Sequence, residues 1–584
     1  MRIHLQKHVV MTQPNYLIVC CLLLTACAQI PQRTEPEQPV SSHQPQAETA
    51  PVLPDVELSN ELLCKFLLTE IASQRGHQTL AVKSSTEIAR KTGDPRLARR
   101  AAQLAVESGD MSKAIAALRY WREVEPTSLL ATRMLSSILL RGGKLDEAQT
   151  ELARILEAEK VNQGYEFMQI FQMVAPYPDK PAALKLLRAL AQPYPQIAEA
   201  HWSVAQLAQL AGDEKLALDE TRQAHKLRPG WSATVSLEAQ LLKKNAPQQA
   251  LEVLRDYLSD YPNMREIRLQ YARLLLEQKQ YKASRREFQR LAKDHPNNPD
   301  IAFAIALISL QLNDFRDAEA QLRQLLDKGN MDQNTVQYYL GQLGEASEDE
   351  ERAITHYREV KDGQHQFAAQ LRVVYLLDKL GRLEEAREYL HQVPPVDNQQ
   401  RVQLILIESQ LLQDAKRTED AYQILQQGME KLPNHPDLLY ATGMLADKIG
   451  KPKVFEQLLR KLIQVKPDYA HAYNALGYSL LERNERIPEA LELVEKALQL
   501  SPDDAAIMDS VGWGYYRSGR LNKSLDMLRR AFASNPDPEI AAHLGEVLWI
   551  HGDKDEARKV WQDSLKIHPG NVPLQAVIEK FTGQ

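Results

Sequence analysis

The sequence lacks the features that define several protein classes. Only 4 of its 584 residues are cysteine, too few for a fold held together by disulfides. No apolar run reaches the ~20 residues that a transmembrane helix requires. An excess of basic residues is also absent, because 71 Lys and Arg against 77 Asp and Glu leave a formal charge of −6. That balance excludes a generally basic nucleic-acid-binding surface.

Recognisable catalytic motifs are missing as well. The chain contains no H-E-x-x-H zinc motif, no G-x-S-x-G nucleophile elbow and no G-x-x-x-x-G-K-[ST] phosphate loop. Val511-Gly512-Trp513-Gly514 has two of the glycines of a dinucleotide-binding loop, but it falls within a predicted helix rather than after a strand. The histidines beyond the leader are scattered and do not share metal-ligand spacing. We therefore expect no enzymatic activity, no metal and no cofactor.

The N-terminus has the layout of a secretory leader. Basic residues precede an apolar core at 17–26, which is shorter than a membrane span. The core ends in Leu24-Thr25-Ala26-Cys27, which resembles the lipobox of bacterial lipoproteins, in which a peptidase cuts before a cysteine that carries diacylglycerol. This resemblance implies a signal peptide at 1–26, Cys27 as the site of lipid attachment, palmitate included, and the outer membrane as the destination.

Two alternatives stay open at this terminus. A plain cleavable signal could end beside a chance cysteine, and Met11 could be the true start, which would leave no Lys or Arg before the apolar core. The segment that follows, 27–56, is rich in Pro, Gln and Glu and cannot bury enough apolar surface to order itself. We expect this segment to tether a lipid-anchored body close to a membrane surface.

The rest of the chain repeats every 33 to 35 residues. One small residue marks the register: twelve of the fifteen positions are Ala, two are Ser and one is Phe. A period of this length, with prolines that end many of the repeats, resembles the tetratricopeptide repeat (TPR), a helix–turn–helix unit. The fifteen register positions are Ala81, Ala114, Ala148, Ala183, Ala217, Ala250, Ser284, Ala318, Ala353, Ala386, Ala421, Phe455, Ala490, Ser524 and Ala557.

The resemblance implies an all-α fold. We expect a TPR solenoid of about fifteen helical pairs over 57–571, coiled as a right-handed superhelix, and a terminal capping helix within 572–584. The match to the repeat is poorest at 161–180, where we expect a bent or shortened repeat. An alternative divides the array into two, with a hinge near 161–180 or near 391–400.

The stretch from Tyr473 to Pro502 matches the repeat best. Within it, Gly477 stands where the first helix meets the second, and Ala490 stands at the facing position. Because glycine has no Cβ, we expect Gly477 to let the two helices approach closely.

In TPR proteins the first helix of each pair lines an inner groove. Transferring those positions to the last three repeats predicts a cluster of aromatic and polar side chains that could anchor an extended peptide or helix. The alternative is that some of these rings pack between repeats. The cluster does not match the carboxylate clamp of chaperone-binding TPR domains. Its residues are Asn474, Tyr478, Asp509, Trp513, Tyr516, Arg517, Glu546 and Trp549.

A second, basic patch maps to the inner face of the second and third repeats. Four guanidinium groups there would attract the carboxylates of a partner. The alternative is a solvated face neutralised by Glu107 and Glu123. The four residues are Arg96, Arg99, Arg133 and Arg141.

Two parts of the array extend the resemblance beyond the repeat itself. Residues 70–76 leading to 94–100, and the closing stretches 508–513 and 537–549, are similar to a family of long TPR lipoproteins of Gram-negative bacteria. At least one branch of that family is an adaptor for a periplasmic C-terminal processing protease and delivers peptidoglycan hydrolases for degradation. The resemblance implies a non-enzymatic adaptor on the periplasmic face of the outer membrane, with periplasmic proteins as partners and no nucleic acid. The alternative is an assembly factor for an envelope machine, such as secretin, pilus or exopolysaccharide export.

Overall fold

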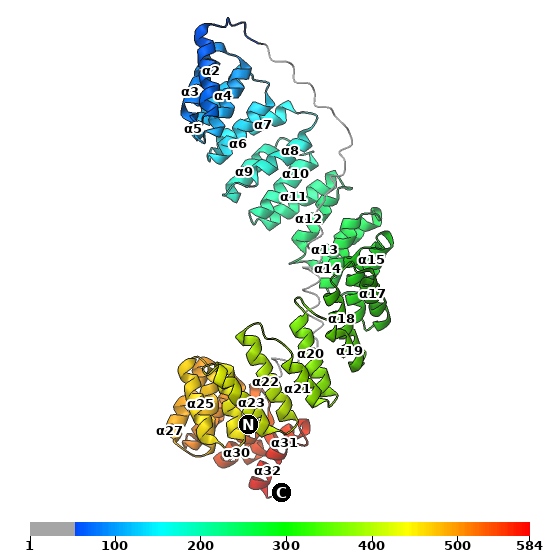
Figure 1. Cartoon of the computed structure of the whole chain (residues 1–584), viewed down its shortest axis with the longest axis vertical. Coiled ribbons are helices and arrows are strands. Elements are labelled where there is room, and N and C mark those ends of the chain that lie inside the picture. The colour runs from blue at the N-terminus through cyan, green and yellow to red at the C-terminus, as the bar shows by residue number, and fades with distance from the viewer. Residues whose placement is uncertain (1–52, 584) are drawn as a thin grey trace. The chain divides into compact units, whose positions relative to one another are not determined.

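The computed structural model describes residues 53–583. The expected signal peptide, Cys27 and most of the expected tether lie outside these residues. The described part consists of 31 helices and contains no strand. The helices form fifteen successive pairs followed by one further helix, which confirms the all-α TPR solenoid (Figure 1).

The even-numbered helices are the first members of the pairs, and the odd-numbered helices are the second members. The first helices are α2 (Asn60–Gln74), α4 (Pro95–Glu107), α6 (Leu129–Arg141), α8 (Gln163–Val174), α10 (Ala198–Leu210), α12 (Ser232–Leu242), α14 (Arg265–Glu277), α16 (Pro299–Gln311), α18 (Gln333–Ala346), α20 (Gln366–Lys379), α22 (Asn398–Asp414), α24 (Pro436–Lys448), α26 (Ala470–Glu482), α28 (Ala505–Arg517) and α30 (Pro538–His551), with α32 (Val572–Thr582) after the last pair.

The second helices carry the small residue that marks the register. They are α3 (Gln78–Thr92), α5 (Met111–Val124), α7 (Leu145–Ala158), α9 (Lys180–Ala191), α11 (Glu214–Leu227), α13 (Pro247–Asp260), α15 (Tyr281–Asp294), α17 (Phe315–Lys328), α19 (Glu350–Arg358), α21 (Leu383–His391), α23 (Thr418–Lys431), α25 (Pro452–Val465), α27 (Ile487–Leu500), α29 (Leu521–Ser534) and α31 (Lys554–Ile567).

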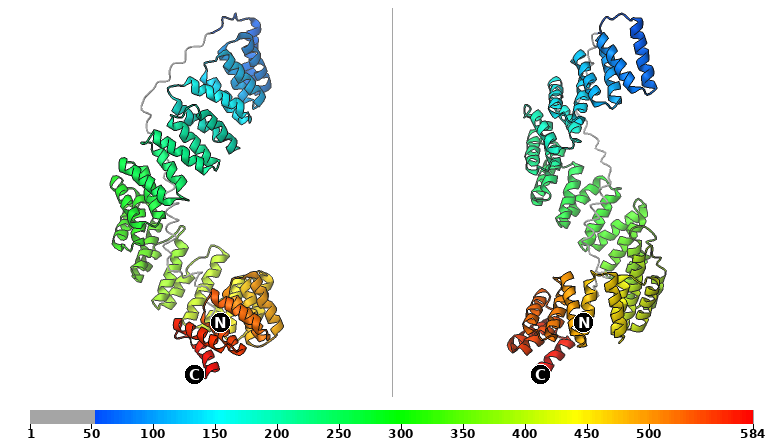
Figure 2. Two further views of the ribbon diagram at one scale, coloured as in Figure 1. Left: turned by 180° about the vertical axis from the view of Figure 1, so that it is seen from behind. Right: turned by 90° about the vertical axis from the view of Figure 1, so that its left-hand side faces the viewer.

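The described residues divide into two compact units, 53–321 and 322–583. The division falls inside α17, at neither of the two positions considered from the sequence. In each unit the pairs follow one another in chain order, as the two further views show (Figure 2).

The register residue is buried in every pair, with at most 2% of its surface exposed. In the best-matching repeat the reason is steric: a Cβ on Gly477 would lie 2.9 Å from the carbonyl oxygen of Ala490. Only a residue without a Cβ at the first position and a small residue at the second allow the two helices to pack this closely. The repeating alanine is therefore a packing residue.

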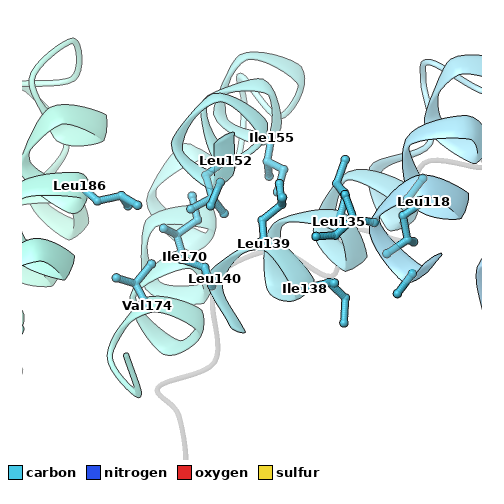
Figure 3. Close-up of a cluster of buried hydrophobic side chains, with 14 of the residues drawn as sticks. Leu118, Leu135, Ile138, Leu139, Leu140, Leu152, Ile155, Ile170, Val174 and Leu186 are labelled. Atoms are coloured by element: carbon cyan, nitrogen blue, oxygen red, sulfur yellow. The ribbon is translucent and has the colours of Figure 1, made fainter. Parts of the chain in front are cut away.

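The core of the first unit lies between the helices of successive pairs. Leu118, Leu135, Leu139, Leu152 and Ile155, from α5, α6 and α7, are almost completely buried and point toward one another (Figure 3). Burying one such side chain contributes about 1.5–3 kcal/mol. Because these side chains come from neighbouring pairs, each repeat is stabilised by the next one.

One pair departs from the regular packing, in the segment where the sequence match is poorest. Helix α8 ends at Val174 because Pro176 and Pro178 cannot continue it. It packs mainly on α10 of the next pair and only slightly on its partner α9. Lys180 Nζ lies 2.7 Å from the carbonyl oxygens of Ala175 and Tyr177 and closes the turn between the two helices.

Several first helices pack on the first helix of the next repeat, for example α26 on α28 and α28 on α30. We call the side formed by the first helices within each unit its inner face. Ion pairs join successive second helices, such as Arg529 Nη2 to Glu556 Oε2 at 2.7 Å. In the second unit, Glu456 of α25 pairs with Arg460 of its own helix and with Arg486, the residue that precedes α27.

Candidate protein-binding site

The predicted cluster of the last three repeats lies on three neighbouring first helices. Asn474 and Tyr478 belong to α26, Asp509 and Trp513 to α28, and Glu546 to α30. Because α28 packs on both α26 and α30, these side chains meet on the inner face of the second unit. The structure thus brings together residues that are up to 72 positions apart in the sequence.

Hydrogen bonds connect this face across repeats. The hydroxyl of Tyr478 donates to Glu539 Oε1 at 3.0 Å, which links α26 to α30 past the whole intervening repeat. The indole N–H of Trp513 donates to Glu482 Oε1 at 2.8 Å. We name the connected residues the inner-face network: Glu482, Tyr478, Asp509, Trp513, Glu539 and His543.

A buried ion pair lies at the centre of the inner-face network. His543 Nδ1 lies 2.9 Å from Asp509 Oδ2, and the imidazole ring stacks on Trp513 with 4.2 Å between ring centroids. Burial lowers the pKa of His543, but the carboxylates of Asp509, Glu539 and Glu482 together outweigh burial, so this pKa is raised. Burial also raises the pKa of Asp509, against the attraction of the imidazolium.

Most of the predicted anchor residues are buried. The exposed fractions are 1% for Asn474, 8% for Tyr478, 5% for Asp509, 6% for Trp513 and 9% for Glu546. Tyr478 and Trp513 therefore pack between repeats, which is the alternative considered from the sequence. Tyr516, Arg517 and Trp549 are partly exposed, and a partner contact through them stays a prediction.

The partly exposed part of the site lies where the last repeat meets α32. The Trp549 ring stacks on Trp561, with 5.8 Å between centroids, and lies 6.4 Å from the ring of Phe581. Arg558 lies over the same indole ring at 5.1 Å. Tyr516 donates to Glu546 Oε1 at 3.2 Å. A rigid aromatic surface with charged neighbours suits the recognition of a protein segment.

Sequence reasoning missed three members of the inner-face network: His543, Glu482 and Glu539. The sequence did contain a signal for His543, because it lies 34 residues after Asp509, which is one repeat period. Residues one period apart on neighbouring first helices come to lie side by side. No comparable spacing indicates the bond from Tyr478 to Glu539, which spans 61 residues.

The predicted basic patch is not a set of four unpaired guanidinium groups. Arg96 Nη2 lies 2.6 Å from Asp94 Oδ2, and Arg133 Nη2 lies 2.6 Å from the buried Glu166. Asp94 and Glu166 thus each pair with one guanidinium group of the patch. Arg99 and Arg141, the other two residues of the patch, differ in surroundings: the Arg99 guanidinium lies over the Trp121 ring at 5.8 Å, and Arg141 is exposed.

Neither a metal site nor a membrane span is found between residues 53 and 583. No group of three or more His, Cys, Asp and Glu side chains in that range could hold a metal ion. None of the helices described there has the length and apolar character needed to cross a bilayer.

Solved structures and curated proteins resemble parts or most of the chain. TTC0263, a thermophilic TPR protein in Thermus thermophilus, is 22% identical with a TM-score of 0.29 and covers 31% of this chain and 99% of its own. MamA from Desulfovibrio magneticus RS-1 is 20% identical with a TM-score of 0.26 and covers 29% and 96%. Cellulose synthase operon protein C of Pseudomonas fluorescens is 23% identical over 269 residues, which cover 43% of this chain and 21% of that protein.

Two further findings identify the family. The TPR repeat-containing protein PA4667 of Pseudomonas aeruginosa is 32% identical over 493 residues, which cover 84% of this chain and 82% of that protein. Models described as tetratricopeptide repeat match residues 89–160, 241–302, 303–369, 440–505 and 512–572. Proteins of this repeat class are generally scaffolds for protein interactions. The chain therefore belongs to the tetratricopeptide repeat family.

Proposed function

We propose that this chain is a non-enzymatic scaffold, tethered to the periplasmic face of the outer membrane through Cys27. In this proposal it brings a periplasmic C-terminal processing protease together with protein substrates such as peptidoglycan hydrolases. The observation that carries the proposal is the uninterrupted series of helical pairs from α2 to α31. The helical pairs supply almost all of the surface of the described residues, and a surface of this kind is suited to binding other proteins.

The two units offer different inner-face chemistry. The first unit carries the paired arginines around Arg96 and Arg133, and the second carries the partly exposed Tyr516, Arg517 and Trp549 beside the buried inner-face network. Distinct surfaces on one chain can hold two proteins at once. A lipid anchor would confine both to one membrane surface and raise their effective concentration.

A pull-down tests the partner class. The lipid-free protein, beginning at residue 28, is incubated with an extract of the bacterial envelope, and the captured proteins are identified by mass spectrometry. We expect a processing protease and cell-wall hydrolases among the captured proteins. Purified protease should then degrade a captured hydrolase faster with the scaffold than without it. Recovery of secretin or export subunits in place of a protease would refute the adaptor function.

The partly exposed end of the candidate site can be tested with the same assay. The double variant Arg517→Glu and Trp549→Ala changes two side chains that are partly exposed, so we expect weaker capture with unchanged helicity. Lys559→Glu, on the exposed surface of α31, is the matched control. Equal capture by both variants would mean that this end does not contact the partner.

The anchor has its own test. Cys27→Ala removes the thiol that would carry diacylglycerol, so the variant should be recovered in the soluble periplasmic fraction. The wild-type chain should sediment with outer membranes. A variant that remained in the outer membrane would refute lipid attachment at Cys27, while leaving the scaffold function untouched.

A second candidate function is assembly of an envelope export machine. The similarity to cellulose synthase operon protein C favours it, although the match covers under half of this chain. The pull-down separates the two functions, because export subunits rather than a protease would then be captured. Deletion of the gene would reduce polymer export instead of raising the level of a hydrolase.

A further inference from the structure

A cleft of about 610 Å³ opens in the first unit, between α13, α14 and α15. It lies where the ends of two second helices meet the first turns of a first helix. No sequence pattern predicted it, and it is separate from both predicted patches. Its lining residues are Arg255, Leu258, Ser259, Pro262, Asn263, Arg268, Tyr271, Glu287, Arg290, Lys293 and Asp294.

The cleft is basic although the chain as a whole is acidic. Four cationic side chains line it, against two carboxylates, Glu287 and Asp294, whereas the chain carries a formal charge of −6. Two second helices supply cations: Arg255, which also pairs with its neighbour Asp256 at 2.9 Å, comes from α13, and Arg290 and Lys293 come from α15. An anionic group in the cleft would meet positive charge from both helices.

Arg268 is held rigidly at the floor of the cleft. Only 9% of this residue is exposed. Its Nη1 donates to Glu287 Oε2 at 2.6 Å, and its Nη2 donates to the carbonyl oxygen of Pro262. Arg290 Nη1 donates to the other oxygen of Glu287 at 2.9 Å. One carboxylate thus orders two guanidinium groups in advance, which reduces the entropy lost when a ligand binds.

Two further groups in the cleft are available as donors. Within residues 53–583, neither the hydroxyl of Tyr271 nor the ammonium of Lys293 has a hydrogen-bond or ion-pair partner. The Tyr271 ring packs against the core of α13 and α14, so its position is fixed. Burial raises the pKa of Tyr271, and the hydroxyl therefore stays a neutral donor at neutral pH.

We infer that this cleft binds an acidic segment of a protein partner. Arg255, Arg290 and Lys293 would pair with the carboxylates of the segment, and Tyr271 would donate to a carboxylate or carbonyl oxygen. Leu258 and Pro262 would contact its aliphatic parts. The volume is within the range of about 300–1,000 Å³ that ligand sites occupy. This inference does not depend on the protease proposal, because it concerns the chemistry of the bound segment and not the identity of the partner protein that carries it.

Fluorescence anisotropy with the full chain tests the inference. The probe is a labelled peptide of alternating Ala and Glu, and its control is the same peptide with Gln in place of Glu. We expect the Glu peptide to bind the wild-type chain and the Gln peptide to bind at least tenfold more weakly. The double variant Arg255→Glu and Arg290→Glu should lose at least tenfold in affinity for the Glu peptide. Tyr271→Phe, which keeps the ring, should lose a few-fold.

The matched control variant is Lys244→Glu with Lys282→Glu. Both lysines are exposed on the same unit, and neither lines the cleft. The control should bind the Glu peptide within twofold of wild type, because the net charge changes equally in both double variants. Equal losses in the two double variants would refute the cleft as the site. Absence of Glu-peptide binding would also refute the inference. Full competition by inorganic phosphate at the same concentration as the peptide would refute it as well, because it would indicate a site for small anions.

Discussion

Tyr478 and Glu539 are joined by a hydrogen bond of 3.0 Å that spans an entire repeat. The donor lies on α26 and the acceptor at the start of α30, so the bond holds two first helices that are not neighbours in the array. The His543 ring stacks on Trp513 and lies 6.1 Å from the Tyr478 ring. The inner face of the last three repeats is therefore stabilised beyond the nearest-neighbour contacts that dominate a solenoid.

Removing the Tyr478 hydroxyl should weaken this connection. We expect Tyr478→Phe to lower the free energy of unfolding of the second unit by about 1 kcal/mol, the usual net value of one hydrogen bond. Urea unfolding followed by circular dichroism measures the effect. Tyr473→Phe on the same helix is the control, since no hydrogen bond of its hydroxyl is found within residues 53–583. Equal effects of the two variants would show that the bond to Glu539 does not contribute.

Stability of the second unit should fall as the pH rises through neutrality. The pKa of His543 and the pKa of Asp509 are both raised, so the folded state binds protons more tightly than the unfolded state. The stabilising contribution of His543 is then fully present below the ordinary pKa of about 6.5 and is lost as the pH rises through the folded value.

The melting temperature measured between about pH 6 and pH 8 tests whether stability falls as the pH rises. Wild type should lose stability over this range, and His543→Gln should lose less of it. Glu482 and Glu539 face the same imidazole and favour its protonated form, so Glu482→Gln should reduce the slope in part. A wild-type melting temperature that rose with pH would contradict the assigned charge state of the pair.

A methyl group on Gly477 should disrupt a helical pair. In Gly477→Ala the Cβ would lie 2.7 Å from Val494 Cγ1 and 2.9 Å from the carbonyl oxygen of Ala490. Overpacking of this kind costs about 1–3 kcal/mol, which outweighs the gain in helix propensity from replacing Gly. Denaturant unfolding measures the loss. Gly570→Ala is the control, because no atom lies within 4 Å of its new Cβ.

The ion pairs around Glu456 should contribute at neutral pH and vanish in acid. Hydrogen bonds from Arg486 and Arg460 lower the pKa of Glu456 to about 2. Its contribution is therefore present above the unfolded pKa of about 4.3 and is lost as the pH falls toward 2. Because the arginines are well solvated, we expect Glu456→Gln to cost at most about 1 kcal/mol at pH 7.

Unfolding of Glu456→Gln and wild type at several pH values tests this expectation. The difference between the two proteins should shrink steadily below about pH 4.5 and should also shrink at high salt. Glu430→Gln, on the exposed surface of α23, serves as the control. A difference that persisted at low pH would mean that the side chain acts through packing rather than through charge.

The repeat fold could be predicted from the amino-acid sequence without coordinates. Each pair must bury a small residue where its helices meet, and this requirement recurs with the 34-residue period, so the series from Ala81 to Ala557 locates every pair. The poor match at 161–180 likewise coincides with the irregular packing of α8, because the prolines that end the helix are visible in the sequence. Local steric demands therefore leave a periodic pattern in the chain.

Which side chains of the inner face are available to a partner depends on the tertiary structure. Tyr478 and Trp513 occupy positions that line an open groove in a single-repeat template, yet they are buried here because α26, α28 and α30 converge and bond to one another. The basic cleft beside Arg268 likewise depends on how three helices meet. The exposure of these side chains depends on how several repeats pack together. The sequence pattern of a single repeat does not determine that packing.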